Sequence, residues 1–196
     1  FLFNSVKHPR VTALARFLEE NHINVYSPRS DMFFQRDEIR LAIGCLMLMF
    51  PRYVQGLENG DYTFLQPEHL TYYRNCIMTT NEYLTRPENV ELLKWIRRRG
   101  KDHVGLTGAT DYAYCGLMYQ LFEFQPFAGI LDTEIDVGIV DIRPARNLAK
   151  LTQIIGKFEY LHRVDVLDAG KYRGKRRIDQ NTEMLFNLYL LSLIHI

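Results

Sequence analysis

The 196-residue chain is short of cysteine and of net charge, and both shortages narrow its possible functions. Its three cysteines, Cys45, Cys76 and Cys115, lie far apart and form no C-x-x-C pair. An odd, scattered set argues against a disulfide framework and against structural zinc, and favours buried thiols in a reducing cytoplasm. The net charge of +1 gives no long-range attraction to a polyanion, so any nucleic-acid contact must come from local clusters.

Several enzyme and membrane signatures are also missing. The sequence has no G-x-x-x-x-G-K-[ST] loop to bind phosphates, no G-x-S-x-G and no H-E-x-x-H. It shows no signal peptide, and its longest strongly apolar run, residues 41–50, is too short to cross a bilayer. We therefore expect a cytoplasmic chain without a complete catalytic set and without a metal site.

Hydrophobic patterning predicts two different parts. Apolar runs at residues 1–5 and 23–26 flank a helix that begins at Pro9, which predicts a strand–helix–strand unit. From residue 37 the pattern is mostly helical, and a cluster of proline and glycine between residues 50 and 61 predicts a boundary. The predicted fold is an α/β N-terminal piece over residues 1–50, followed by a mainly α-helical domain over residues 51–196.

Both ends of the sequence lie in apolar stretches. The chain begins directly in an apolar run without an initiator methionine, and it stops inside an apolar helical pattern. Native termini usually lie in polar, frayed segments. We therefore expect a fragment of a longer protein.

Two aromatic residues and an arginine precede the apolar helix that begins at residue 37. Asp37 and Glu38 suit the positive N-terminal end of a helix, whereas Arg36 suits it only beside an anion or a carboxylate. Arg36 could bind a DNA phosphate while a neighbouring aromatic stacks on a base. Alternatively, Phe33 and Phe34 anchor the helix to a sheet and Arg36 pairs with Asp37 or Glu38.

The string F-F-x-R-x-E-I at residues 33–39 resembles a block of the superfamily 1 DNA helicases of the UvrD/Rep/PcrA type. Residues 3–11, 17–20 and 24–26 are similar to the segments that precede this block in those enzymes, in the same order. The resemblance covers about residues 1–50, a quarter of the chain. It departs from the family at residues 28–30, where Pro-Arg-Ser replaces the usual glycine pair.

The resemblance implies a fragment with part of domain 2A (residues 1–50) and most of the helical 2B insertion (residues 51–196). The parent protein would be an ATP-dependent 3′→5′ DNA helicase that uses ATP and Mg²⁺, bound mainly outside this fragment. Its partners would be single-stranded and duplex DNA and the missing RecA-like domains of the same chain. Arg36, Phe34 and Asn4 would contact single-stranded DNA, and the fragment alone would be inactive.

Two basic clusters could contact duplex DNA. Residues 97–101 end a predicted helix, and residues 170–179 predict a loop that carries Lys175, Arg176 and Arg177. Contacts from either cluster to phosphates would make binding depend on salt. Alternatively, the helix cluster only complements a helix C-terminus and is otherwise solvated.

Two other functions remain open on the sequence. The chain could be a helical DNA-binding or protein-binding module without a motor. It could also belong to a helicase relative that has lost ATPase activity and works within a nuclease complex. Single-stranded-DNA-stimulated ATP hydrolysis by the longer protein separates the helicase from both.

Overall fold

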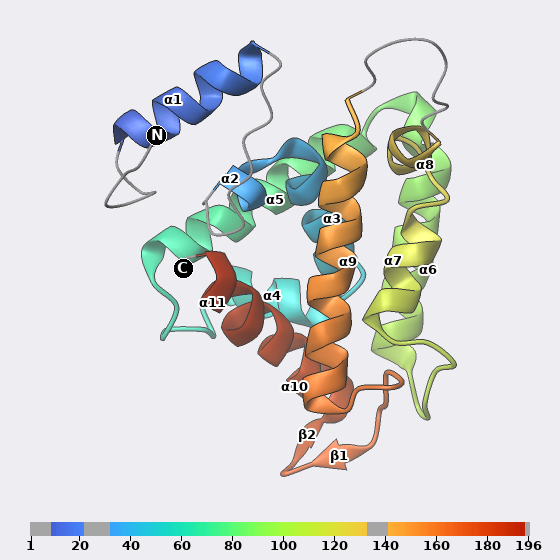
Figure 1. Cartoon of the computed structure of the whole chain (residues 1–196). Helices are drawn as coiled ribbons and strands as arrows, with labels where there is room; N and C mark the ends of the chain where they lie inside the picture. Colours follow the sequence, from blue (N-terminus) through green and yellow to red (C-terminus); the bar gives the residue numbers. More distant parts are fainter. Residues whose placement is uncertain (1–8, 22–31, 133–140, 195–196) are drawn as a thin grey trace.

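The computed structural model of the chain describes residues 9–21, 32–132 and 141–194 (Figure 1). Nearly all regular structure in these ranges is helical, and one short hairpin is the exception. The elements, in chain order, are α1 (Pro9–Glu20), α2 (Met32–Gln35), α3 (Asp37–Leu48), α4 (Pro51–Asn59), α5 (Pro67–Leu84), the 3-10 helix η1 (Pro87–Asn89), α6 (Val90–Gly105), α7 (Tyr114–Leu121), α8 (Phe127–Leu131), α9 (Arg143–His162), β1 (Lys171–Tyr172), β2 (Lys175–Arg176), α10 (Arg177–Glu183), the π-helix η2 (Met184–Leu190) and α11 (Leu191–Ile194).

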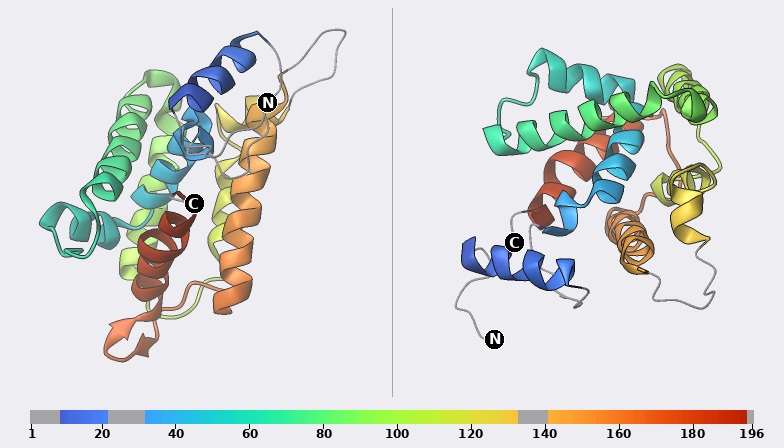
Figure 2. Two further views of the ribbon diagram at one scale, coloured as in Figure 1. Left: turned by 60° about the vertical axis from the view of Figure 1, so that its left-hand side comes forward. Right: turned by 90° about the horizontal axis from the view of Figure 1, so that it is seen from above.

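Helix α3 lies at the centre of the helical body. Eight of its twelve residues are buried, on all of its faces. A helix that is apolar all round needs neighbours on every side. Helix α5 is its main partner, and α4, α6, α7 and α9 also pack against it (Figure 2).

The contact between α3 and α5 depends on a glycine. A Cβ atom at Gly44 would overlap the Thr80 hydroxyl and lie 2.5 Å from the Cys76 carbonyl oxygen. The missing side chain therefore lets the two backbones approach closely. Thr80 and Cys76 are both fully buried at this crossing.

The C-terminal segment returns to close the core over α4 and α5. The Tyr53 hydroxyl donates to Asn187 Oδ1 at 2.6 Å, and the Tyr73 hydroxyl donates to the Phe186 carbonyl oxygen. The rings of Tyr53 and Phe186 stack with their centroids 4.9 Å apart. Asn187 and Phe186 lie on the π-helix η2, so this irregular segment carries the contacts that join the C-terminal part of the chain to α4 and α5.

The hairpin follows α9 in the chain, packs beside the end of α6 and leads directly into α10. Strands β1 and β2 pair antiparallel, and the turn between them has positive φ angles at Arg173 (51°) and Gly174 (83°). Next to it, the Thr110 amide donates to the Leu167 carbonyl oxygen at 2.9 Å, and Ala109 and Asp168 form a β-bridge. These bonds hold the hairpin against the segment that follows α6.

The mainly helical prediction for residues 37–194 is confirmed in the described ranges. Helices begin at Pro67 and next to Pro144, as these prolines predict. Pro51, which the sequence placed in the boundary segment, opens α4. The prediction of an irregular loop over residues 170–179 is wrong, because a hairpin forms there and α10 begins at Arg177. The hairpin forms because the tight turn at Arg173 and Gly174, both with positive φ, reverses the chain within two residues.

The predicted N-terminal α/β unit is only partly described. Its helix corresponds to α1, and both predicted strands, residues 1–5 and 23–26, lie outside the described residues. The boundary between residues 50 and 61 stays a prediction. Across this segment, α3 shares buried contacts with α5 and α6, so the hydrophobic core continues from one side to the other.

Among the described helices, none combines the length and the apolarity that are needed to span a bilayer.

Replacing Gly44 by alanine should destabilise the chain by about 1–3 kcal/mol, because the added methyl group overpacks the α3–α5 contact. The matched control is Gly105→Ala at the end of α6, where an added Cβ has no heavy atom within 4 Å. Urea unfolding of both variants checks this. Equal stability of the two variants would show that α3 and α5 can separate without cost.

Candidate nucleic-acid interface

Arg36 stands at the break between α2 and α3. Its backbone is extended (φ −66°, ψ 139°), and its amide donates to the Phe33 carbonyl oxygen at 3.3 Å. Its side chain is partly exposed. The start of α3 is tied to α9, because Asn147 Nδ2 donates to Glu38 Oε1 at 2.7 Å. The arginine therefore projects from a fixed corner of the helical body.

A second arginine and a carboxylate lie close to Arg36. Arg143 donates to both carboxylate oxygens of Asp141 at 2.7 Å. These bonds, and to a smaller extent the charge of Arg36, lower the pKa of Asp141. Asp141 pairs with Arg143, and Asp37 and Glu38 stand in the first turn of α3, so carboxylates balance the arginines at this corner.

Phe34 is a core side chain in this arrangement. It is 4% exposed, and its ring meets those of Phe33 and Tyr72 edge to face at centroid distances of 5.0 and 6.5 Å. The Tyr72 hydroxyl also donates to the Phe34 carbonyl oxygen at 2.9 Å. Phe34 thus anchors α2 to α5, and Phe33 is the more exposed ring of the pair. A DNA contact of Phe34 stays a prediction, and Asn4 lies outside the described residues.

The three predicted basic residues of the hairpin each face oxygen atoms of the protein. Lys175 Nζ lies 2.6 Å from the Glu183 carboxylate, and Arg177 lies 3.7 Å from that of Asp168. The Arg176 side chain is 13% exposed, and it donates to the carbonyl oxygens of His103 and Val104 at 2.7 and 3.1 Å.

Arg176 therefore caps the C-terminal end of α6, where helix carbonyl groups have no partner within the helix. Lys175 and Arg177 keep about half of their side-chain surface exposed, at 52% and 57%. Lys175 and Arg176 lie on the second strand of the hairpin, and Arg177 is the first residue of α10. Their contact with duplex DNA stays a prediction, and their observed contacts stabilise the hairpin.

The basic cluster of residues 97–101 lies within α6, and its side chains differ in exposure. Arg99 points inward, where it donates to Gln120 Oε1 at 2.6 Å and lies over the Tyr112 ring at 5.0 Å. Arg97 and Arg98 are exposed. Lys101 is exposed as well. The prediction that residues 97–101 end a helix is wrong, because α6 continues to Gly105.

His103 is a buried polar residue that the sequence did not indicate. Its Nδ1 lies 2.7 Å from the Met49 carbonyl oxygen and its Nε2 lies 3.2 Å from the Tyr112 hydroxyl. Its ring stacks on Phe50 at 4.7 Å. Burial lowers the pKa of His103, and the nearby charge of Arg99 acts in the same direction. The described residues hold no cluster of His, Cys, Asp and Glu that could bind a metal ion.

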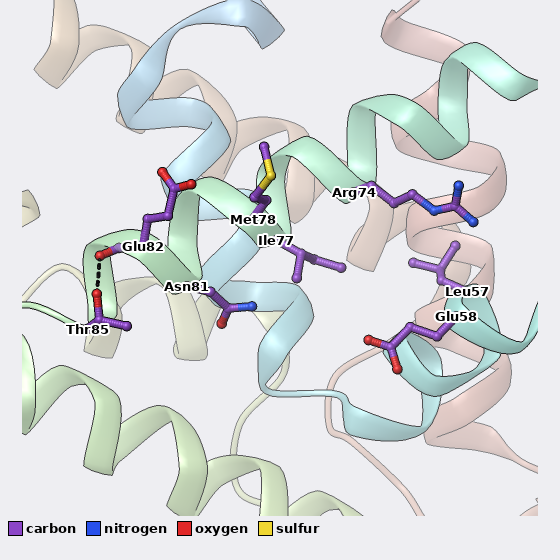
Figure 3. Close-up of a pocket in the computed structure, with 8 residues that line it drawn as sticks. All are labelled: Leu57, Glu58, Arg74, Ile77, Met78, Asn81, Glu82 and Thr85. Carbon is purple, nitrogen blue, oxygen red and sulfur yellow. Dashed lines mark hydrogen bonds between the residues drawn. The ribbon is translucent and has the colours of Figure 1, made fainter.

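A groove of about 470 Å³ lies between α4 and α5 (Figure 3). Its lining residues are Leu57, Glu58, Arg74, Ile77, Met78, Asn81, Glu82 and Thr85. The Thr85 hydroxyl donates to the Glu82 carbonyl oxygen at 2.7 Å, so it is not paired with a general base. This groove offers no catalytic arrangement.

No protein-family model matches the chain, and neither a curated protein nor a solved structure matches it.

Replacing Arg176 by alanine should lower the free energy of unfolding by about 1–3 kcal/mol, because two carbonyl groups at the end of α6 lose a charged donor. Lys171→Ala removes the same charge from an exposed site on the same hairpin, and should change stability by less than about 0.5 kcal/mol. Thermal and urea unfolding distinguish the two. If both variants lose the same stability, the capping role of Arg176 is refuted.

His103 should make the chain less stable in mild acid. Its ordinary pKa is 6.5 and its folded pKa is lower, so the unfolded state binds the proton more strongly. The stabilisation is complete above 6.5 and is lost as the pH falls through the folded pKa. The free energy of unfolding should therefore fall less steeply with acidification in His103→Gln than in the wild type.

Proposed function

We propose that the chain is part of an ATP-dependent 3′→5′ DNA helicase of the UvrD/Rep/PcrA type. It contributes contacts to single-stranded DNA at Arg36 and a helical body that faces the duplex and regulates unwinding. The observation that carries the proposal is the string F-F-x-R-x-E-I at residues 33–39, with similar segments before it in the same order.

The geometry of Arg36 supports the proposal. A phosphate contact requires a guanidinium group that solvent can reach and a backbone that stays in place. Arg36 is partly exposed, and its neighbours fix the backbone on both sides: the buried Phe34 packs against α5, and the half-buried Glu38 is bonded to α9.

ATP and Mg²⁺ belong to the rest of the proposed enzyme. The P-loop that would hold the phosphates is absent from this sequence. Bound between the RecA-like domains of the same protein, the nucleotide would supply the free energy of translocation. The role of the present residues is to bind and orient DNA, so the chain by itself neither hydrolyses ATP nor unwinds a duplex.

The alternative is a helical DNA-binding or protein-binding module without a motor, or an ATPase-dead helicase relative in a nuclease complex. The pairing of Lys175, Arg176 and Arg177 within the protein favours the protein-binding form of this module, because it lowers the charge available to a duplex. ATP hydrolysis by the longer protein, stimulated by single-stranded DNA, would exclude this alternative.

Replacing Arg36 by alanine should weaken binding of single-stranded DNA by about 1–3 kcal/mol, because a charge-assisted hydrogen bond to phosphate is lost. The dependence of affinity on salt should also become shallower by about one counterion. Fluorescence anisotropy with a labelled oligonucleotide at several salt concentrations measures both. Arg36→Lys should retain most of the salt dependence.

The control is Lys157→Ala, which removes one exposed positive charge from α9. It should leave affinity and salt dependence close to the wild type. An Arg36→Ala variant that folds normally and keeps the wild-type affinity and salt slope would reject the role of Arg36.

A further inference from the structure

A cavity of about 380 Å³ lies between the start of α4, residues 60–66, the end of α6 and the hairpin with α10. Its volume is at the lower end of the range for small-molecule sites, about 300–1,000 Å³. It is far from residue 36 in the sequence, and the proposed DNA contact of Arg36 does not use it. Its walls combine aromatic rings, carboxylates and two basic side chains.

The aromatic wall ends in an open ring. Tyr62 stacks on Tyr53 with centroids 5.3 Å apart and is buried. Phe64 meets Tyr62 edge to face at 6.3 Å but is 64% exposed. A large apolar ring on a short loop at a cavity offers a stacking surface for a planar ligand.

Three carboxylates, those of Asp61, Asp179 and Glu183, line the cavity and provide hydrogen-bond acceptors. Glu183 Oε1 accepts from the Tyr62 hydroxyl at 3.2 Å, and the same carboxylate holds Lys175. The Asp61 carboxylate also lines the cavity, and it has no hydrogen-bond or ion-pair partner in the described part of the chain. Asp61 is therefore able to accept a hydrogen bond from a ligand without giving up a bond within the protein.

Two basic side chains complete the lining. Arg52 and Lys175 are each about half exposed, at 51% and 52%. Arg52 lies 3.6 Å from the Asp179 carboxylate, at the long end of ion-pair distances. An anionic group could therefore draw Arg52 away at little cost.

We propose that this cavity binds one nucleotide of single-stranded DNA. The base stacks on Phe64, its exocyclic amino group donates to Asp61, and its phosphate lies near Arg52 and Lys175. This assignment uses all three kinds of side chain in the cavity. It rests on the proposed function only for the source of the nucleotide, a DNA strand.

The carboxylate makes the site selective among bases. Cytosine, adenine and guanine carry an exocyclic amino group, whereas thymine presents only acceptors and one ring N–H. The cavity should therefore prefer oligo(dC) to oligo(dT), although both strands carry the same phosphate charge. Arg36, which contacts phosphate, should not distinguish the two.

The test measures the affinities of the full chain for labelled oligo(dC) and oligo(dT) by fluorescence anisotropy. The wild type should bind oligo(dC) several-fold more tightly. Phe64→Ala should weaken oligo(dC) binding roughly tenfold, and Phe64→Trp should restore it, since stacking needs only a ring. Asp61→Ala should reduce the ratio of the two affinities towards one. Tyr160→Ala removes a ring that is 83% exposed on α9, and it should change nothing.

Three outcomes would overturn the assignment. One is a folded Phe64→Ala variant with unchanged oligo(dC) affinity, and another is a wild type that binds both strands equally. The third is competition by arginine amide but not by dCMP, which would identify an organic cation as the ligand. Loss of DNA binding in Arg36→Ala with normal binding in Phe64→Ala would refute this cavity and leave the proposed function standing.

Discussion

The burial of α3 on all of its faces is the constraint on which the rest of the structure depends. A helix without a polar face is stable in water only when other helices surround it, and α4, α5, α6, α7 and α9 do so. Gly44 brings the nearest of these, α5, into close contact. This packing also fixes the position of Arg36, because α2 is anchored on α5 and the start of α3 is bonded to α9.

The parts of the fold that the sequence predicted depend on local signals. The apolar run of α3 and the prolines at the starts of α5 and α9 act within a few residues of themselves. The features that it missed depend on distant partners. Arg176 is a capping residue because α6 ends beside it, more than seventy residues earlier in the chain. Phe34 is buried because Tyr72 packs against it, and nothing near residue 34 indicates which of the two adjacent rings turns inward.

Charge in this molecule is balanced locally as well as in total. The hairpin cations lie beside carboxylates or helix carbonyl groups, and Arg99 is enclosed by aromatic rings. Such pairing weakens a general attraction to polyanions. It leaves specific places where a ligand can compete with groups of the protein for a charged side chain. The corner around Arg36 and the cavity beside Phe64 are two such places. The first provides a positive charge that could bind a phosphate group. The second adds a ring that could stack on a base and a carboxylate that could accept a hydrogen bond from it.

The return of the C-terminal segment over α4 and α5 has a consequence for how the chain folds. The hydrogen bonds from Tyr53 and Tyr73 join residues 134 and 113 positions apart. Contacts between such distant residues form late, because a long loop must close before they stabilise anything. On the ribosome, the aromatic face of α4 and α5 therefore stays uncovered until residues 186 and 187 have been synthesised. During that interval the nascent chain exposes apolar surface, which makes it prone to aggregation.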